Sequence, residues 1–252
     1  MWEALHASML HWYRLLGAGS DGARTFERDG VVAALVPASP QRSVVNAVVY
    51  EDPAALAAAY DEIVAAYGEI GAKWTVWAHD GDTATAALLE SKGHVLDGTP
   101  MAMAADLVES PPQRPPAGTL ADWTAEGELS DVGAINDRAY GYPGDWFSRA
   151  LRRMPEGAVH IYVARQDGEA VGCCATADTG SNSEVQMVAV VPEARGQGLS
   201  GKLIAHALAD AVDRGVRTST LVATQLGRPV YERLGFRPLG VLEMWERRLE
   251  QR

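Results

Sequence analysis

The stretch EVQMVAVVPEARGQGLSGKLIAHALADAVDR, residues 184–214, decides the fold of this chain. Residues 184–191 are rich in β-branched side chains and predict a strand, which Pro192 ends because proline lacks a backbone donor. From Leu199 onward, apolar residues repeat at helical spacing and predict a helix. Three glycines between positions 196 and 201 allow a tight turn that leaves backbone amides uncovered. Such amides at the start of a helix bind anions, above all phosphate.

This glycine-rich turn follows neither of the common nucleotide-binding patterns. A P-loop needs Gly-Lys-Ser/Thr after four intervening residues, and the dinucleotide fingerprint needs an acidic residue about 20 positions after its glycines. The segment Val190-Val191-Pro192 followed by RGQGLS at 195–200 instead resembles the pyrophosphate loop of the GNAT superfamily of acyl-CoA-dependent N-acyltransferases. Ser200 stands where that family usually has glycine or alanine, and we expect the loop to tolerate this small residue.

A second segment strengthens the resemblance. GRPVYERLGF, residues 227–236, is similar to the late helix and strand of the same family, at the expected distance from the glycine-rich turn. An ordinary β–α turn explains the first segment taken alone, but not the two together. The chain is therefore identified as a member of the GNAT superfamily. The resemblance implies an α+β fold with two tandem GNAT-like domains, each a mixed, mostly antiparallel twisted sheet flanked by helices.

Length and composition indicate a soluble globular protein with two domains. The 252 residues are 47% apolar and 22% charged, and domains usually have about 100–150 residues. No apolar run approaches the roughly 20 residues of a membrane span, and no signal pattern is present at the N-terminus, so we expect a cytoplasmic protein without a membrane partner. The net charge of −11 argues against nucleic acid as a partner, because its binding needs a basic face.

The two cysteines, Cys173 and Cys174, are adjacent in a predicted strand. Their side chains are therefore expected to point to opposite faces and to pack as reduced thiols, since they supply neither a disulfide framework nor a metal cluster. The six histidines show no ligand-like pairing with cysteine, so we expect no metal site.

Residues 1–107 predict the element order α-β-β-β-α-β-α-β-β, which the second half repeats without its sequence. Their ending, AALLESKGH at 86–94 followed by MAMAADL at 101–107, resembles the helix-Gly-strand-strand finish of the GNAT family. Yet Glu51-Asp52-Pro53 follows the third strand without a glycine turn, and two carboxylates there repel a pyrophosphate. We predict that residues 1–107 form a degenerate GNAT-like domain that does not bind coenzyme A.

Four prolines in residues 108–118 predict a stiff linker, which precedes a catalytic domain at 119–252. We expect this domain to contain a short strand near 119–123, helices at about 126–138 and 145–153, strands at 158–166 and 170–177 joined by an Asp167-Gly168 hairpin turn, a strand at 218–224, a helix at 228–234 and two closing strands at 235–242 and 244–249.

The resemblance implies where acetyl-CoA binds. Backbone amides of the turn and the dipole of the following helix are expected to hold the pyrophosphate. The central strand splays from its parallel neighbour in this family, so its backbone is expected to pair with the pantetheine arm, and an amide at its end is a candidate oxyanion donor. The residues at these places are Val188, Ala189, Val190, Arg195, Gly196, Gln197, Gly198, Leu199, Ser200 and Gly201. The strand side chains alternatively serve only as core.

The resemblance also implies two catalytic groups. Tyr231 matches the family tyrosine that protonates the leaving thiolate, and a phenol with a reference pKa of about 10 suits that role. The alternative is a packed tyrosine at a helix–sheet contact. Glu184 opens the central strand where many relatives carry a base for the attacking amine. Many relatives work without a strong base, so the alternative for Glu184 is a solvated charge at the strand end.

The acceptor site is the least defined part. The residues where the family walls its acceptor pocket are Tyr140, Tyr142, Asp145 and Trp146, with Asn182 and His160 as weaker candidates. Aromatic rings with one acid suit a cation or a ring, and local packing explains them equally.

The function expected from the resemblance is acetyl-CoA-dependent N-acetyl transfer by direct attack of a small-molecule primary amine. Two alternatives remain open: O-acyl transfer or decarboxylation with the same cofactor, and a non-catalytic role in coenzyme A sensing or scaffolding. We expect either a monomer, whose two halves form a pseudo-dimer, or a homodimer.

Overall fold

The structure is a computed structural model that describes residues 1–116, 123–124, 128–142 and 144–248. The N-terminal half contains α1 (Trp2–Ala18), β1 (Arg24–Arg28), β2 (Val31–Leu35), β3 (Ala47–Tyr50), α2 (Pro53–Ile70), β4 (Trp74–His79), α3 (Thr83–Ser91), β5 (Val95–Gly98) and β6 (Met101–Asp106). Its element order, α-β-β-β-α-β-α-β-β, is the one that the sequence predicts.

The C-terminal half contains β7 (Trp123–Thr124), α4 (Leu129–Tyr140), α5 (Trp146–Leu151), β8 (His160–Gln166), β9 (Glu169–Thr179), β10 (Asn182–Val190), the 3-10 helix η1 (Pro192–Ala194), α6 (Leu199–Asp213), β11 (Thr218–Ala223), α7 (Arg228–Arg233) and β12 (Arg237–Arg247). The expected strand near 119–123 lies mostly outside the described residues. The hairpin turn between β8 and β9 is confirmed, because Asp167 and Gly168 have φ angles of 52° and 81°.

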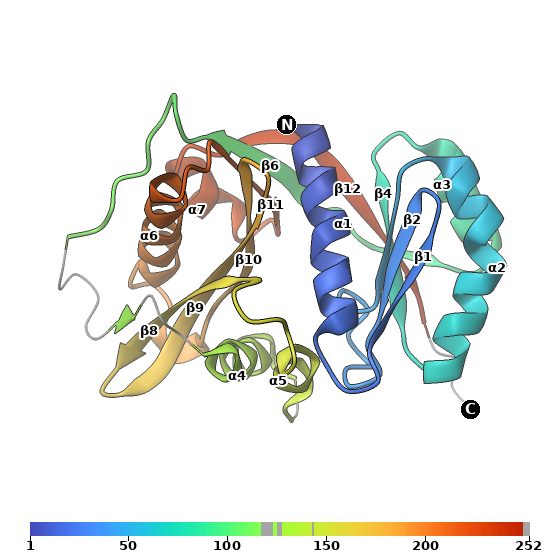
Figure 1. Cartoon of the computed structure of the whole chain (residues 1–252), viewed down its shortest axis with the longest axis horizontal. Coiled ribbons are helices and arrows are strands. Elements are labelled where there is room, and N and C mark those ends of the chain that lie inside the picture. The colour runs from blue at the N-terminus through green and yellow to red at the C-terminus, as the bar shows by residue number, and fades with distance from the viewer. Residues whose placement is uncertain (117–122, 125–127, 143, 249–252) are drawn as a thin grey trace.

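The strands form a single twisted sheet in the order β1-β2-β3-β4-β12-β6-β11-β10-β9-β8-β7, with β5 paired to β12. Two neighbouring pairs, β3–β4 and β10–β11, are parallel, and the other pairs are antiparallel. Figure 1 shows helices on both sides of this sheet. The mixed, mostly antiparallel α+β fold that the resemblance implies is therefore confirmed.

The two halves exchange strands across the linker. In the sheet of the C-terminal half, β6 lies between β11 and β12. The first part of β12 pairs with β6 as far as Val241, and its second part, from Leu242 to Arg247, pairs with β4 of the N-terminal half. The proposed division into residues 1–107 and 119–252 stays a prediction from the sequence, and strand pairing crosses it in both directions.

The prediction of two closing strands, 235–242 and 244–249, is wrong. Arg237–Arg247 is one strand, which bends at irregularities next to Pro238 and Met244 while its ladders continue. A bulge changes the direction of a strand without ending it, and here it lets one strand serve two neighbours.

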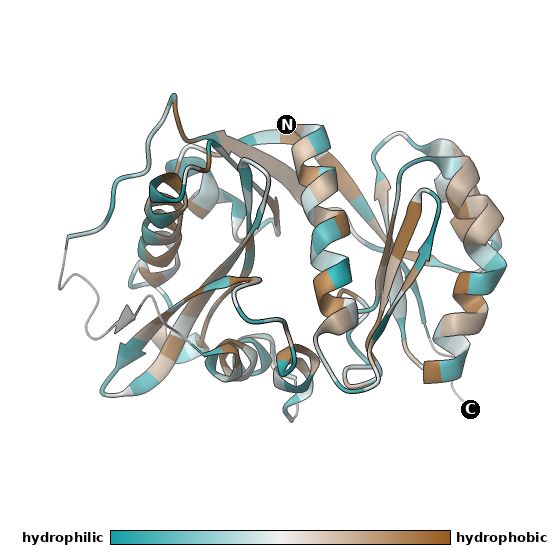
Figure 2. Ribbon diagram, in the orientation of Figure 1, coloured by the Kyte–Doolittle hydropathy of each residue, from teal (hydrophilic) through white to brown (hydrophobic). Residues whose placement is uncertain are grey.

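The helix α1 lies between the two halves (Figure 1). It packs on β2 of its own half and on β9 and β10 of the other, so Leu5, Trp12 and Leu16 belong to one hydrophobic core that extends into both halves. A second core lies under α2, around Leu56 and Ile63. Figure 2 shows hydrophobic residues along the central strands and hydrophilic residues on the side of α6 turned away from the sheet.

Helices α6 and α4 cover opposite faces of the β8–β10 region. Leu203 of α6 lies over Gly172, whereas Asn136 of α4 contacts Cys173, and successive strand residues point to opposite faces. Both cysteines are free and fully buried, as the sequence predicts. Burial raises the pKa of Cys173 to about 12, which makes this thiol inert. None of the described helices is both long and apolar enough to cross a membrane.

Candidate active site

The central strand β10 separates from its parallel neighbour halfway along its length. It pairs with β11 only through Asn182–Glu184, whereas its other edge pairs with β9 as far as Val190. A bulge interrupts the β9 ladder between Gln186 and Ala189. Residues 185–190 therefore have no ladder partner on the β11 side in the described structure. This is the free strand edge that the resemblance predicts for the pantetheine arm.

Met187 holds the bulge in a strained conformation that the sequence does not signal. Its φ of 54° is unusual for a residue with a side chain. Its carbonyl oxygen accepts hydrogen bonds from Cys173 Sγ at 3.2 Å and from Asn136 Nδ2 at 3.4 Å. These buried contacts from β9 and α4 fix the point where β10 turns away from β11.

The glycine-rich turn forms an open anion-binding end on α6. Gly196 and Gly198 have φ angles of 80° and 72°, a region that other residues rarely adopt. Gly198 is the N-cap of α6, and no side chain caps this helix. The first amides of a helix lack partners within it, and the residues from 195 to 198 are exposed. The turn therefore offers unpaired donors and a helix dipole to an anion.

Arg195 shapes this turn from outside. Its Nε donates to Val190 O at 3.1 Å, and its Nη2 donates to Ala139 O at 2.8 Å. An ion pair between Arg138 and Glu193 adds a second link between α4 and the turn. The guanidinium group of Arg195 thus binds backbone carbonyl oxygens, and it holds the end of α4 against the glycine-rich turn.

Tyr231 lies on α7 in contact with the core. Its ring meets Phe236 edge-on, with 6.0 Å between centroids, and a Cβ at Gly227 would lie only 3.1 Å from its Cε2. Burial raises the pKa of Tyr231, and the nearby Cys174 and Tyr140 act in the same direction. Its hydroxyl has no hydrogen-bond partner among the described residues. This phenol is protonated at neutral pH and has a proton to donate.

Glu184 is fully buried, with 0% of its surface exposed. Neither carboxylate oxygen has a hydrogen-bond partner in the part of the chain that the structure describes. Burial raises the pKa of Glu184 to about 8, and Gln186 offsets this shift only in part. The alternative of a solvated charge at the strand end is therefore wrong. An orphaned buried carboxyl is costly to keep, and a pKa near 8 suits a general base.

Glu184 faces the N-terminal half. The charge of its carboxylate acts on Tyr13 of α1, whose hydroxyl accepts from Trp77 Nε1 at 2.6 Å and donates to Val44 O at 3.1 Å. On the same face of β10, Asn182 donates to Ser8 of α1 at 2.9 Å. Side chains from both halves therefore surround the start of β10.

The residues predicted for the acceptor wall gather at the corner between α4 and α5. Tyr140 ends α4 and is 56% exposed. The rings of Tyr142 and Trp146 lie 6.4 Å apart, and Asp145 is exposed at the N-cap position of α5 without capping it. The structure thus brings these residues together, on the face of the sheet that α1 also covers.

Arg42, which no pattern in the sequence singles out, enters this corner from the N-terminal half. It is 5% exposed, and its guanidinium carbon lies 4.3 Å from the ring centroid of Tyr142 and 4.4 Å from that of Phe147. Its Nη1 donates to Asp137 Oδ1 at 3.2 Å. The aromatic residues suit a cation, and the cation that lies on the ring of Tyr142 is the side chain of Arg42. No local pattern reveals a pair that lies 95 positions apart.

The two weaker candidates are engaged by neighbours. Asn182 donates to Thr220 Oγ1 at 2.8 Å as well as to Ser8, and so ties β10 to β11 and α1. His160 lies 3.4 Å from Asp178. Burial is the main cause that lowers the pKa of His160.

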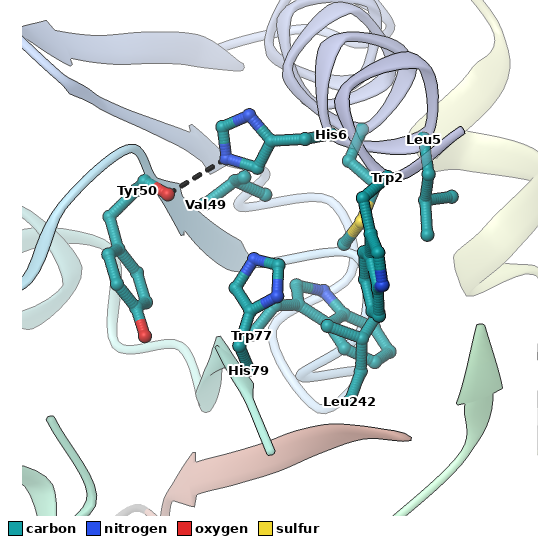
Figure 3. A pocket seen from close by; sticks show the side chains of 9 residues that line it. Trp2, Leu5, His6, Val49, Tyr50, Trp77, His79 and Leu242 are labelled. Carbon is teal, nitrogen blue, oxygen red and sulfur yellow. Dashed lines mark hydrogen bonds between the residues drawn. The ribbon is translucent and has the colours of Figure 1, made fainter. Parts of the chain in front are cut away.

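In the N-terminal half, the parallel strands β3 and β4 also separate, but side chains of α1 fill the space between them. The parallel pairing of β3 and β4 stops at Val48, and beyond it the carbonyl oxygen of Tyr50 lies 2.8 Å from His6 Nε2 of α1. Figure 3 shows Trp2 and His6 of α1 beside His79 at the end of β4, around a cavity of only about 10 Å³. That volume holds about one water molecule.

The helix that follows β3 is also closed to anions. The Asp52 carboxylate accepts from the amides of Ala54 at 2.8 Å and Ala55 at 3.0 Å. Helix α2 therefore begins with its donors bound by a negative charge, whereas α6 begins with exposed glycine.

Comparison with known protein families finds a match in the C-terminal half of the chain. Residues 157–238 match the acetyltransferase (GNAT) domain family. An uncharacterised N-acetyltransferase of Chlorobaculum tepidum is 28% identical over 114 residues, which are 44% of this chain and 72% of that protein.

Solved structures share the fold over most of the chain. A GCN5-related N-acetyltransferase from Kribbella flavida has a TM-score of 0.66 at 20% identity and covers 95% of both chains. A tandem GNAT protein from the clavulanic acid biosynthesis pathway has a TM-score of 0.57 at 17% identity, over 88% of this chain and 79% of that one. The domain match includes the splayed strand, the glycine-rich turn and Tyr231, and residues 157–238 are accordingly assigned to the acetyltransferase (GNAT) domain family.

Proposed function

We propose that the chain is an acetyl-CoA-dependent N-acetyltransferase that acetylates a small-molecule primary amine by direct attack. One observation carries this proposal: the free edge of β10 leads directly into an uncapped, glycine-lined helix start. An extended arm that ends in a pyrophosphate needs this combination, because the arm pairs with a strand edge and the anion binds at a helix N-terminus.

In the proposed reaction the cofactor is held by backbone groups. Amides of Gln197–Gly201 bind the pyrophosphate, and the backbone of Val188–Val190 pairs with the pantetheine arm. The amine nitrogen forms a bond with the acetyl carbon, and the bond from that carbon to sulfur breaks. The amine proton leaves to Glu184 or to water, and Tyr231 gives a proton to the departing thiolate.

The environments of the two catalytic groups support these roles. Tyr231 stays protonated at neutral pH, so its proton is present when charge develops on the sulfur. Glu184, with a pKa of about 8, exchanges a proton within the range in which an amine substrate does the same. Because Glu184 is fully buried, the proton reaches it through a group or a water molecule beside it.

One cofactor site per chain is part of the proposal. The N-terminal half lacks an open helix start, since Asp52 caps α2, and His6 binds the carbonyl oxygen at the end of β3. A monomer in which the halves form a pseudo-dimer agrees with the exchange of β6 and β12.

Calorimetric titration of the full chain with acetyl-CoA tests the proposal. We expect one site per chain in the wild type and none in Gly198→Asp, because a carboxylate there repels the pyrophosphate. The matched control is Gly71→Asp, which adds the same charge at another left-handed glycine, in the N-terminal half. Two sites would contradict the degenerate reading of residues 1–107, and no binding to the wild type would favour a scaffold role.

Product analysis then identifies the chemistry. A panel of primary amines is incubated with acetyl-CoA, and free thiol and acetylated product are measured by absorbance and mass spectrometry. Direct transfer predicts one N-acetylated amine for each coenzyme A released. An ester product, or release of carbon dioxide from a malonyl donor, would point instead to one of the alternative reactions.

A further inference from the structure

Arg42 is a buried cation that joins the two halves at the acceptor corner. It lies in the loop between β2 and β3, and it inserts between the rings of Tyr142 and Phe147 with its guanidinium group on Asp137. Burying a charge is costly unless it is paired. Here a carboxylate and two aromatic faces meet it, so the position of this side chain is strongly specified.

The loop that presents Arg42 is held from within. Asn46 is fully buried, and its Oδ1 accepts from the Val36 amide at 2.7 Å. Its Nδ2 donates to Ser39 O at 2.9 Å and to Arg42 O at 3.4 Å. The backbone of Arg42 is therefore held in place by its own half.

Asp137 links Arg42 to the start of α5. Besides the guanidinium group, its carboxylate accepts from the amide of Phe147 at 3.1 Å and from that of Ser148 at 3.4 Å. These are the second and third amides of α5, and Asp145 does not cap them. The carbonyl oxygen of Asp137 accepts from the Tyr142 amide at 2.9 Å. Asp137 thus binds backbone amides at the end of α4 and at the start of α5, and Arg42 orients its carboxylate.

The N-terminal half also holds the far end of α5. The Arg153 amide donates to Gly19 O at 2.7 Å, and a Cβ at Gly19 would lie 2.7 Å from Ala150 O, so the two backbones are in close contact. Asp21 forms exposed ion pairs with Arg152 and Arg153. Exposed pairs contribute little, so at this end the backbone contacts at Gly19 attach α5 to the N-terminal half, whereas at its start the buried Arg42 contact does.

We propose that the N-terminal half is a working part of the acceptor site, with Arg42 as the positioning residue that holds the α4–α5 corner in the geometry that receives the amine. This inference rests on the proposed function for the identity of the corner as the acceptor wall. It gives residues 1–107 a role that needs no cofactor of their own.

A lysine does not replace Arg42 in this role. The planar guanidinium group stacks on two rings while it donates to a carboxylate, whereas an ammonium group is a compact point charge. The Nε of Arg42 has no hydrogen-bond partner in the described residues. Its contacts with the rings therefore carry much of the interaction.

The test compares Arg42→Lys and Arg42→Ala with Arg24→Ala. Arg24 is an exposed arginine of the same half, paired with Glu69 away from the corner, so its loss controls for the removal of one charge. For an amine that the wild type acetylates, both Arg42 variants are expected to raise the KM of the amine about tenfold or more, since small misplacements are costly. The affinity for acetyl-CoA, measured by calorimetry, is expected to stay within about twofold in every variant.

Two further readouts separate positioning from general stability. Hydrogen exchange at the amides of Phe147 and Ser148 is expected to accelerate in the Arg42 variants and not in Arg24→Ala. Millimolar methylguanidinium is expected to restore the amine KM of Arg42→Ala by refilling the space between Tyr142 and Phe147, whereas ammonium at equal ionic strength is expected to have no effect.

Unchanged exchange at these two amides would overturn the proposal. So would a parallel loss of kcat, acetyl-CoA binding and melting temperature, because that pattern means only that the fold is weakened. If the wild type acetylates no amine of the panel, the proposed function fails, and exchange and its reversal by methylguanidinium still decide whether Arg42 holds the corner.

Discussion

Two groups of the candidate site, the fully buried Glu184 and the half-buried Tyr231, are protonated at neutral pH for the same reason. Burial reduces the contact of each group with water, which disfavours the charged form and raises the pKa of both. Glu184 accepts a proton only in its ionised form, which becomes more populated as the pH approaches 8, whereas Tyr231 has a proton to donate. The two groups fit the two ends of an acyl transfer. Substitution of each residue therefore tests its role directly.

Glu184 is expected to make stability depend on pH. Its pKa is about 8 in the folded chain against a reference value of 4.5, so between these values the folded state binds one more proton than the unfolded state. The resulting stabilisation is complete below pH 4.5 and is lost as the pH rises through 8, at up to about 1.4 kcal/mol per pH unit. The free energy of unfolding of the wild type, relative to Glu184→Gln, should fall by roughly 3–4 kcal/mol from pH 5 to pH 8. Urea denaturation of both proteins at the two pH values measures this, and a constant difference would mean that the carboxyl is hydrated.

Tyr231→Phe removes the proposed proton donor and keeps the ring. Because the hydroxyl has no partner among the described residues and the ring packs on Phe236, stability should change by less than about 1 kcal/mol. Turnover is expected to fall by about 10²-fold or more, with the Kd of acetyl-CoA nearly unchanged. Steady-state kinetics beside calorimetry checks this, and unchanged turnover would remove Tyr231 from the mechanism.

At the scale of elements, the two halves differ in how the helix after the splayed strand begins. Helix α2 starts with Asp52 on its first amides, and α6 starts with Gly198 and open amides. The same strand-to-helix connection is therefore a stabilising cap in one half and a proposed binding site in the other.

The cap can be removed separately. Asp52→Ala is expected to lower the free energy of unfolding by about 1 kcal/mol, because two amides of α2 lose their acceptor. The control is Glu51→Ala, which deletes the neighbouring exposed carboxylate and should have almost no effect on stability. Urea denaturation measures both variants, and equal effects would mean that charge at this position, not capping, is what matters.

Sequence reasoning succeeded for elements whose signals are local. Periodicity and turn residues predict the helices, most strands and the glycine-rich turn. The fold class comes from the resemblance of residues 190–200 and 227–236 to the GNAT family. It failed for β12, because whether residues 235–249 form one strand or two depends on the edges that β4 and β6 present. It could not find the bulge at Met187 or the contact of Arg42 with Asp137, since both are imposed by residues distant along the chain.

For the whole molecule, strand exchange predicts that neither half is stable alone. Without residues 1–107, the sheet of the C-terminal half loses β6 from between β11 and β12; without residues 119–252, β4 and β5 lose their partner β12. Each half expressed alone is expected to be unfolded or aggregated by circular dichroism and gel filtration. Expressed together as separate chains, they should form a 1:1 folded complex. A folded, monomeric half would contradict this prediction.

The position of β12 also has a consequence during synthesis on the ribosome. The partner of β4, residues Leu242–Arg247, is translated roughly 140 positions after the N-terminal half is complete, a delay of about 10–30 s at ordinary elongation rates. During that time β4 presents an open edge, which is a site for pairing with other chains. Chaperones that shield nascent strands should therefore raise the yield of this protein by covering β4 of the N-terminal half. The residues that protect β4 in the folded protein, 242–247, are made only at the end of synthesis.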